Sequence, residues 1–396
     1  MAVFEYFRIP YLIALRYYRK LWVRVVFFAV LAVFVAGLAP FAATLLGSEV
    51  SVKVGREAVL PVLNILATSM LAVSTFSLNV MVSAHRAAAE NATPRSHRVL
   101  LENTTTHSVL SVFIGAFVYS LSSIILYQLG FYPDRAGLIV MGVTIFVAII
   151  VVGAMLRWID HLSHLGSMDY ILKTVSQRAR DSLIDARRDP NFGAVALDDR
   201  VVLPEATYPI ASPKSGYIQL LNVESMSREL PEGAVLYVHH IPGEHILEGQ
   251  PIASLSMRPT EALSLKIVDT FTMGSERSFE QDPEFGLQVL TEIASRALSP
   301  GVNDPGTAIQ VIDRLAELVW QAAGVAPDEE EPQHTNIFVP LRDPARLVEI
   351  AFDPIARDGS GIGEVTTALD RALGALSQTP DARISHASQA LKRRKT

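Results

Sequence analysis

Six polar residues recur at regular intervals in one otherwise apolar segment. They are Glu57, Asn64, Thr68, Thr75, Asn79 and Arg86, with successive separations of 7, 4, 7, 4 and 7 residues. At about 100° per helical residue, this spacing puts all six within about 60° of one helix face, here called the polar stripe. An amide in lipid is costly unless protein or water replaces the hydrogen bonds that it loses. The polar stripe must therefore face protein or water.

Two interpretations of the polar stripe remain open from the sequence. In the first, the stripe packs against the other membrane spans and its amides join helices. In the second, it lines a hydrated path through a ring of identical subunits, with Glu57 at the outer mouth and Arg86 at the inner mouth. No charged residue lies in the middle of any apolar span. That absence argues against an ion-coupled transporter, whose relays place charges there.

The familiar catalytic signatures are missing from the chain. It has no Cys, which excludes a thiol nucleophile, a disulfide framework and Cys-ligated zinc or iron–sulfur. Neither an HExxH motif, nor a Walker A loop, nor a GxSxG elbow occurs. His161 and His164 share a helix face after the last span, but no third ligand accompanies them. We therefore expect no metal, no cofactor and no enzymatic activity.

Composition and charge divide the chain into two halves. Hydrophobic residues make up 50% of its 396 residues and charged residues 19%, against about 25% charged in ordinary soluble domains. Residues 1–157 carry a net charge of +6 and residues 158–396 a net charge of −12. This pattern predicts a membrane domain followed by an acidic soluble domain. The negative charge of that second half disfavours nucleic acid as a partner.

The first half predicts a polytopic helical membrane domain over residues 25–157, preceded by an interfacial helix at residues 1–24. Each of four uncharged segments exceeds the roughly 20 residues needed to cross a bilayer. They are Val25–Ser48, Ala58–Ala84, Ser108–Tyr132 and Ala136–Leu156. Basic residues cluster before the first span and after the second, which predicts a cytoplasmic N-terminus. Four crossings then place the C-terminus and the acidic half in the cytoplasm.

The second half predicts an α+β cytoplasmic domain. A linker helix covers residues 158–190, and short strands between Gly and Pro residues cover 191–260. Residues 261–380 are mainly helical with a strand at Asn336–Pro340, and 381–396 form a basic tail in which Lys392–Lys395 are disordered. The segments Ser215–Ile218 and Gly243–Ile252 resemble the barrel-sandwich hybrid of biotinyl and lipoyl carriers. The Lys that such carriers modify is missing between them, so the resemblance implies only a small β-sandwich or barrel.

A helical hairpin and a charged cluster are also predicted here. Asp282–Pro283 and Asp304–Pro305 each place an N-cap carboxylate before a Pro at the first helical position, which predicts an αα-hairpin. Charged and polar residues crowd this region, and they predict either a small-ligand site or a plain salt-bridge network. They are Glu276, Arg277, Glu280, Asp282, Arg296, Asn303 and Asp304.

Two stretches of the chain resemble a known family. Residues 282–290 and 296–308 carry one signature, and Thr93–Arg95 followed by residues 113–119 carry another. Both are similar to the bacterial predicted membrane proteins catalogued as domain of unknown function 2254, although members usually have Ser where this chain has Thr93. The resemblance implies a bacterial inner-membrane protein and no established activity. We expect the hairpin, through Asn303, Asp304 and Pro305, to dock beneath the 85–107 loop at Pro94 and Arg95 and couple the two domains.

These observations favour a homo-oligomeric ion channel or pore regulated by its cytoplasmic domain. Its partners would be the lipid bilayer, further copies of itself and inorganic ions. The alternative is a membrane-anchored sensor or scaffold, in which the spans only anchor the chain and the cytoplasmic domain binds a ligand or protein.

Overall fold

A computed structural model describes residues 21–45, 56–91, 93–96, 104–132, 137–164, 167–198, 200–201, 207–328 and 331–395. The chain divides into two compact units. The first contains residues 1–91 and 97–170, and the second contains residues 92–96 and 171–396. Each unit is described separately below. The interfacial helix predicted at residues 1–24 lies almost entirely outside the described residues.

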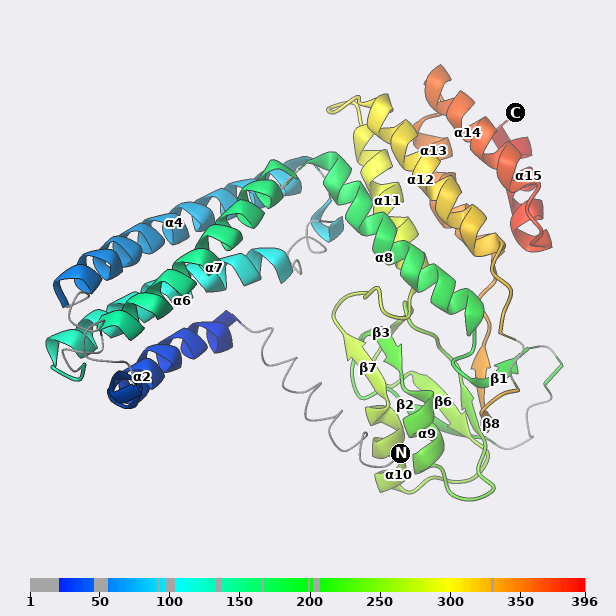
Figure 1. Cartoon of the computed structure of the whole chain (residues 1–396). Helices are drawn as coiled ribbons and strands as arrows, with labels where there is room; N and C mark the ends of the chain where they lie inside the picture. Colours follow the sequence, from blue (N-terminus) through cyan, green and yellow to red (C-terminus); the bar gives the residue numbers. More distant parts are fainter. Residues whose placement is uncertain are drawn as a thin grey trace. The chain divides into compact units, whose positions relative to one another are not determined.

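Long apolar helices build the first unit (Figure 1). They are α2 (Leu21–Leu45), α4 (Arg56–Asn91), α6 (Thr104–Gln128) and α7 (Gly137–His164). Among the described residues, three helical segments are long and apolar enough to cross a membrane: Glu57–Ala84, Ser108–Gln128 and Gly137–Leu162. Helix α2 contributes only the shorter apolar stretch Val25–Val35. Three of the four predicted spans are therefore supported, and the first is not confirmed as a full span.

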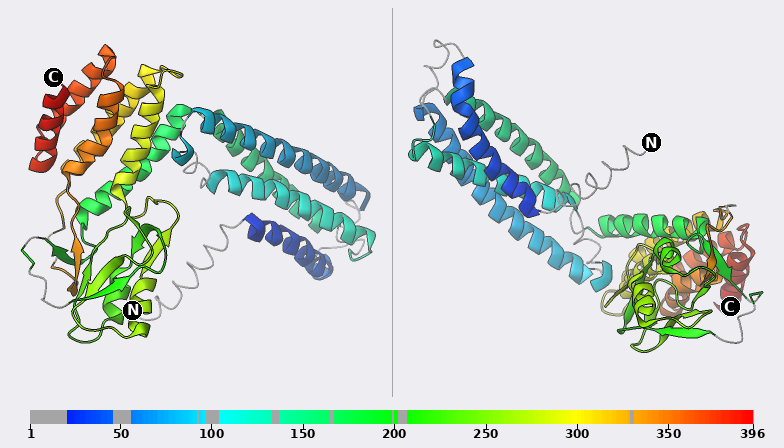
Figure 2. Two further views of the ribbon diagram at one scale, coloured as in Figure 1. Left: turned by 180° about the vertical axis from the view of Figure 1, so that it is seen from behind. Right: turned by 90° about the horizontal axis from the view of Figure 1, so that it is seen from below.

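Helix α6 is the central helix of this unit, because it packs most extensively against α2 and α4 and also contacts α7 (Figure 2). Phe113, Ala116 and Tyr119 on α6 are fully buried. The Tyr119 hydroxyl lies 3.2 Å from the Thr144 hydroxyl and joins α6 to α7. A methyl group at Gly115 would overlap the ring of Phe28. Glycine at this position therefore allows α2 and α6 to approach closely.

The predicted linker helix at residues 158–190 is divided in the structure. Helix α7 continues to His164, and α8 (Met168–Arg188) begins as a separate helix. Ile171, Leu172, Val175 and Leu183 form the buried face of α8. Its burial pattern is that of an amphipathic helix of a soluble domain, whereas α7 is apolar on nearly every face.

Two β-sheets form the lower part of the second unit in Figure 1. Their strands are β1 (Ala194–Leu197), β2 (Tyr208–Ala211), β3 (Gly216–Leu221), β4 (Leu236–Val238), β5 (His245–Ile246), β6 (Pro251–Leu255), β7 (Phe271–Gly274) and β8 (His334–Pro340). The five-stranded sheet has the order β1-β8-β4-β6-β2, and the three-stranded sheet has the order β5-β3-β7. Strand β8 runs parallel to both of its neighbours, while β4, β6 and β2 are antiparallel. The short helices α9 (Val223–Glu229) and α10 (Glu261–Asp269) accompany the sheets.

The prediction is a small β-sandwich or barrel, and no closed barrel is found in the described residues. Both sheets are open, and the larger one includes β8, which lies far beyond the stretch at 191–260 that was expected to form the β domain. Ile337 and Val339 on β8 are fully buried in the same core as Leu236 and Val238 on β4. Strand β8 inserts between β1 and β4 because these apolar side chains become buried in the shared core. Its neighbours in the sheet are not its neighbours in the sequence.

A helical layer completes the second unit. It contains α11 (Pro283–Ala297), α12 (Pro305–Ala323), α13 (Ala345–Asp358), α14 (Gly363–Leu376) and α15 (Ala382–Lys395). The predicted αα-hairpin is present as α11 and α12, and the carboxylates of Asp282 and Asp304 cap them. The predicted basic tail at 381–396 contains α15, so the disorder predicted for Lys392–Lys395 is wrong. Ile384 and Leu391 of that helix are buried, and α15 packs against α13 and α14.

Candidate functional site

The polar stripe lies on an exposed face of α4. All six of its side chains are exposed to solvent in the protomer. The opposite face of α4 carries Val59, Leu63, Leu66 and Met70, which are buried against the helical core of the first unit. By helical geometry the two faces are separated by about 150°. The structure therefore does not place the polar stripe between the described helices of one protomer.

The hydroxyl groups of the polar stripe are satisfied within α4 itself. Thr68 Oγ1 donates to the carbonyl of Asn64 at 2.9 Å, and Thr75 Oγ1 donates to the carbonyl of Leu71 at 2.6 Å. Such bonds to the preceding turn let Thr residues lie in a membrane helix at little cost. The two threonines therefore need no partner outside the helix.

The two asparagines differ from the threonines. The side-chain amides of Asn64 and Asn79 donate no hydrogen bond to any described residue of the protomer and accept none. Each amide offers two donors and one acceptor oxygen with two lone pairs. In a membrane these groups need a partner that the protomer does not supply. The unsatisfied polarity of the stripe is thus concentrated in Asn64 and Asn79.

Large apolar side chains flank the polar stripe on both sides. Ile65 and Phe76 are 69% and 62% exposed on one flank, and Leu71 and Leu78 are 53% and 45% exposed on the other. The outer face of α4 is therefore a polar seam inside an apolar surface. Apolar flanks suit lipid or a neighbouring helix, and the seam requires polar groups or water.

A second polar feature, the charge cluster, lies in the second unit. It consists of Arg277, Asp282, Glu284, Arg342 and Arg346. Asp282 is only 1% exposed and accepts bonds from Arg277 Nε at 2.6 Å and Arg277 Nη2 at 2.8 Å. Its Oδ1 also accepts from the backbone N–H of Phe285, which caps α11. One buried carboxylate thus joins the helix start to the preceding loop.

Glu284, the second carboxylate of the charge cluster, is surrounded by three guanidinium groups. Its Oε1 lies 3.2 Å from Arg346 Nε and 3.7 Å from Arg342 Nη1, and its Oε2 lies 3.9 Å from Arg277 Nη2. Only the Arg346 contact is within hydrogen-bond distance. The cluster therefore contains three formal positive charges and two formal negative charges.

The charge cluster affects its two most buried arginines in opposite ways. Burial opposes the charge of both guanidinium groups. For Arg277 the hydrogen bond and the charge of Asp282 outweigh burial, so the pKa of Arg277 is raised. For Arg342 burial dominates over the attraction of Asp282 and Glu284, so its pKa is lowered. Arg342 is the less well compensated cation.

The structure separates the residues that were expected to crowd together. Arg277 and Asp282 meet in the charge cluster, whereas Asp304 caps α12 from an exposed position and bonds Thr307. Those bonds to the Thr307 hydroxyl and backbone N–H lower the pKa of Asp304. Sequence reasoning missed Glu284, Arg342 and Arg346. An acid in the first turn of α11 was a usable signal for Glu284, but no local pattern marks the two arginines.

Arg95 contacts the first helix of the hairpin within the second unit. It forms an ion pair with Glu292 on α11. Glu292 also accepts from Gln288 at 3.1 Å, and Gln288 accepts from Arg277 at 2.6 Å. No hydrogen bond or ion pair joins Arg95 to Asn303 or Asp304 in the described part of the chain. The contact therefore involves the body of α11, and Pro94, Asn303 and Pro305 contribute no such bond to it.

The described residues contain no group of three or more His, Cys, Asp or Glu side chains that could hold a metal ion. His161, one of the two histidines noted in the sequence, packs against the rings of Trp158 and Tyr170. These contacts give it an aromatic environment typical of a packing residue.

The sequence pattern of the predicted membrane protein family DUF2254 matches residues 18–375. The chain belongs to this family. Uncharacterized proteins of Mycobacterium bovis and Mycobacterium tuberculosis strain H37Rv are each 26% identical to the DUF2254 chain over 334 residues. Each alignment covers 80% of this chain and 63% of the relative, so the chain spans less than two thirds of the length of these relatives. No solved structure matches it.

Proposed function

We propose that this DUF2254 protein is a homo-oligomeric ion channel or pore of the bacterial inner membrane, in which the polar stripe of α4 faces the central axis. One observation carries the proposal: Asn64 and Asn79 lie on a helix long and apolar enough to cross a membrane, are exposed in the protomer and have no side-chain hydrogen bond to any of its described residues. Lipid cannot supply hydrogen bonds to them, whereas water in a pore or a second copy of α4 can.

Self-association is favoured over a different partner by the chemistry of the stripe. An amide is both donor and acceptor, so identical helices can pair Asn with Asn across a symmetry axis. Glu57 and Arg86 lie at opposite ends of the stripe, just outside the uncharged segment Ala58–Ala84 of α4. In a ring of such helices, the Glu57 carboxylates would surround one mouth of the pore and the Arg86 guanidinium groups the other. Between the two mouths, ions would pass the amides and hydroxyls of the stripe.

The second unit fits a regulatory role in this proposal. The basic flanks of the spans favour a cytoplasmic position for both termini in this proposal. The net charge of −12 over residues 158–396 would attract cations to the inner mouth and repel nucleic acid. The proposal assigns no catalytic step and no cofactor to the protein.

Flux through purified protein tests the proposal. The full-length chain is reconstituted into liposomes loaded with potassium, and efflux is measured over a range of voltage and membrane tension. We expect flux above that of empty liposomes, and a larger change in flux for Asn64→Leu/Asn79→Leu than for Thr68→Val/Thr75→Val, whose hydroxyls already bond the backbone of α4. Flux equal to that of empty liposomes under every condition would contradict conduction.

The alternative function is a membrane-anchored sensor or scaffold. The charge cluster and the pocket beside it favour this alternative, because they lie in the second unit and do not involve a pore. An oligomer that conducts nothing but binds a ligand or protein through residues 171–396 would support the sensor or scaffold.

A further inference from the structure

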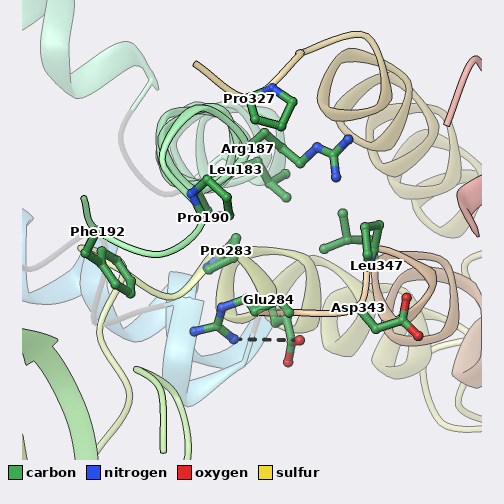
Figure 3. Close-up of a pocket in the computed structure, with 12 residues that line it drawn as sticks. Leu183, Arg187, Pro190, Phe192, Pro283, Glu284, Pro327, Asp343 and Leu347 are labelled. Atoms are coloured by element: carbon green, nitrogen blue, oxygen red, sulfur yellow. Dashed lines mark ion pairs between the residues drawn. The ribbon is translucent and has the colours of Figure 1, made fainter. Parts of the chain in front are cut away.

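A pocket opens beside the charge cluster, entirely within the second unit. The end of α8, the start of α11 and the start of α13 surround it, and the space measures about 600 Å³ including its open mouth (Figure 3). Apolar side chains form most of its wall. They are Leu183, Ala186, Pro190, Phe192, Pro283, Pro327, Pro344 and Leu347. Figure 3 shows the labelled prolines and leucines around a common space, with Arg187, Glu284 and Asp343 at its edges.

Among the charged residues that line the pocket, Arg342 has the weakest contacts with groups of opposite charge. Its Nη2 donates to the backbone carbonyls of Pro242 and Gln281, and its Nη1 lies 3.7 Å from Glu284, too far for a hydrogen bond. Its Nε and Nη1 donors have no acceptor within hydrogen-bond distance in the described part of the chain. The side chain is only 17% exposed. A partly buried guanidinium with donors that no described residue accepts from can bind an anion.

The other charged groups at the pocket are already paired. Arg187 binds Asp381 at 2.7 Å, and Asp343 lies 3.4 Å from Arg383. The charge of Glu244 also acts on Arg342, but Glu244 is 45% exposed and lies 2.6 Å from His240. The charge cluster itself has three guanidinium groups and two carboxylates, which leaves one positive charge in excess. A single negative charge would balance it.

We propose that this pocket binds an amphipathic monoanion, a molecule with one carboxylate head and a compact apolar body. The head accepts hydrogen bonds from Arg342, and the body contacts the proline- and leucine-rich wall that includes Phe192. The site goes beyond the proposed channel, since it lies in the second unit and requires no oligomer or flux. It would give that unit a small-molecule ligand of defined chemical class.

Binding of a matched set of probes tests the proposal on the intact chain. Full-length protein in nanodiscs is titrated calorimetrically with 4-phenylbutyrate, with its neutral amide 4-phenylbutanamide and with the cation 4-phenylbutylamine, and empty nanodiscs provide the baseline. We expect saturable binding of the carboxylate and at least about tenfold weaker binding of the amide and the amine, because charged hydrogen bonds to Arg342 are lost. Equal binding of the three probes, or no saturable carboxylate binding, would overturn the proposal.

Three variants locate the site. Arg342→Gln removes the proposed anion contact and should weaken 4-phenylbutyrate binding about tenfold or more. Arg346→Gln is the matched control, since it removes another guanidinium from Glu284 but does not line the pocket. Because the Arg346 side chain is 58% exposed and solvent screens its charge, the affinity of this variant for 4-phenylbutyrate should stay within about threefold of wild type. Ala186→Phe fills the pocket without changing charge and should also abolish binding. An Arg346→Gln loss as large as that of Arg342→Gln, or unchanged binding by Ala186→Phe, would refute the assignment.

Discussion

The polar stripe and the charge cluster both contain polar groups in apolar surroundings, but they differ in whether the chain itself supplies partners for those groups. Asp282 and Glu284 are 1% and 7% exposed, and each has guanidinium partners within the chain. Asn64 and Asn79 are exposed on a membrane helix and have no side-chain partner in the described protomer. The difference shows which polar groups serve the fold of one chain and which require something outside it.

The charge cluster also shows that in-chain partners are unevenly matched. Arg277 is held by two short bonds to Asp282, whereas Arg342 keeps donors unused beside a pocket. Arg342 therefore resembles Asn64 and Asn79 on α4, because each keeps hydrogen-bond donors that no described residue accepts from. In both regions, function is assigned where the chain leaves polar groups unsatisfied.

The largest predicted effect is at the buried helix cap. Asp282→Ala removes a helix cap and also leaves Arg277 buried without its main partner, so the local unfolding free energy of α11 should fall by about 3–5 kcal/mol. Asp304→Ala is the matched control, an exposed Asp–Pro cap whose loss should cost α12 about 1 kcal/mol. Hydrogen exchange of α11 and α12 measures both. Equal losses of unfolding free energy in the two variants would show that the ion pair between Arg277 and Asp282 contributes nothing to the stability of α11.

An intermediate effect is predicted for the polar stripe. Asn64→Leu/Asn79→Leu should weaken self-association in a bilayer by about 1–2 kcal/mol, since it removes interhelical amide bonds. Thr68→Val/Thr75→Val should leave association unchanged, because these hydroxyls bond the backbone of α4 itself. Energy transfer between labelled copies in vesicles reports the association constant. If the Thr variant dissociates as much as the Asn variant, the distinction between them is wrong.

The smallest effect is predicted at the exposed ion pair between Arg95 and Glu292, whose side chains are 52% and 26% exposed. Arg95→Glu should destabilise the docking of residues 93–96 on α11 by about 1 kcal/mol or less, because solvent screens the pair. The charge-swapped Arg95→Glu/Glu292→Arg should restore it. Proteolytic cleavage rates around residue 96 measure the docking, and a swap no better than the single variant would argue against a specific pair.

Local patterns in the sequence were sufficient for several elements. The Asp–Pro pairs predicted both helices of the hairpin, because N-caps and proline act within one turn. Apolar length alone predicted three spans that the structure supports. The spacing of the polar stripe also showed that its six residues share one face of α4.

Tertiary packing decided the remaining features. Strand β8 joins β1 and β4 because Ile337 and Val339 enter their core, a choice that no nearby residue encodes. The basic tail folds as α15 because Ile384 and Leu391 find apolar neighbours on α13 and α14. Arg342 reaches Glu284 across 58 positions of chain, so no local spacing could reveal their proximity.

Helical periodicity, capping and apolar length are local properties, and the order of residues determines them directly. Which face of α4 packs on α6 depends on the fit of all the neighbouring helices. Only that packing left Asn64 and Asn79 on the outer surface, and only the meeting of α8, α11 and α13 placed Arg342 beside an apolar pocket.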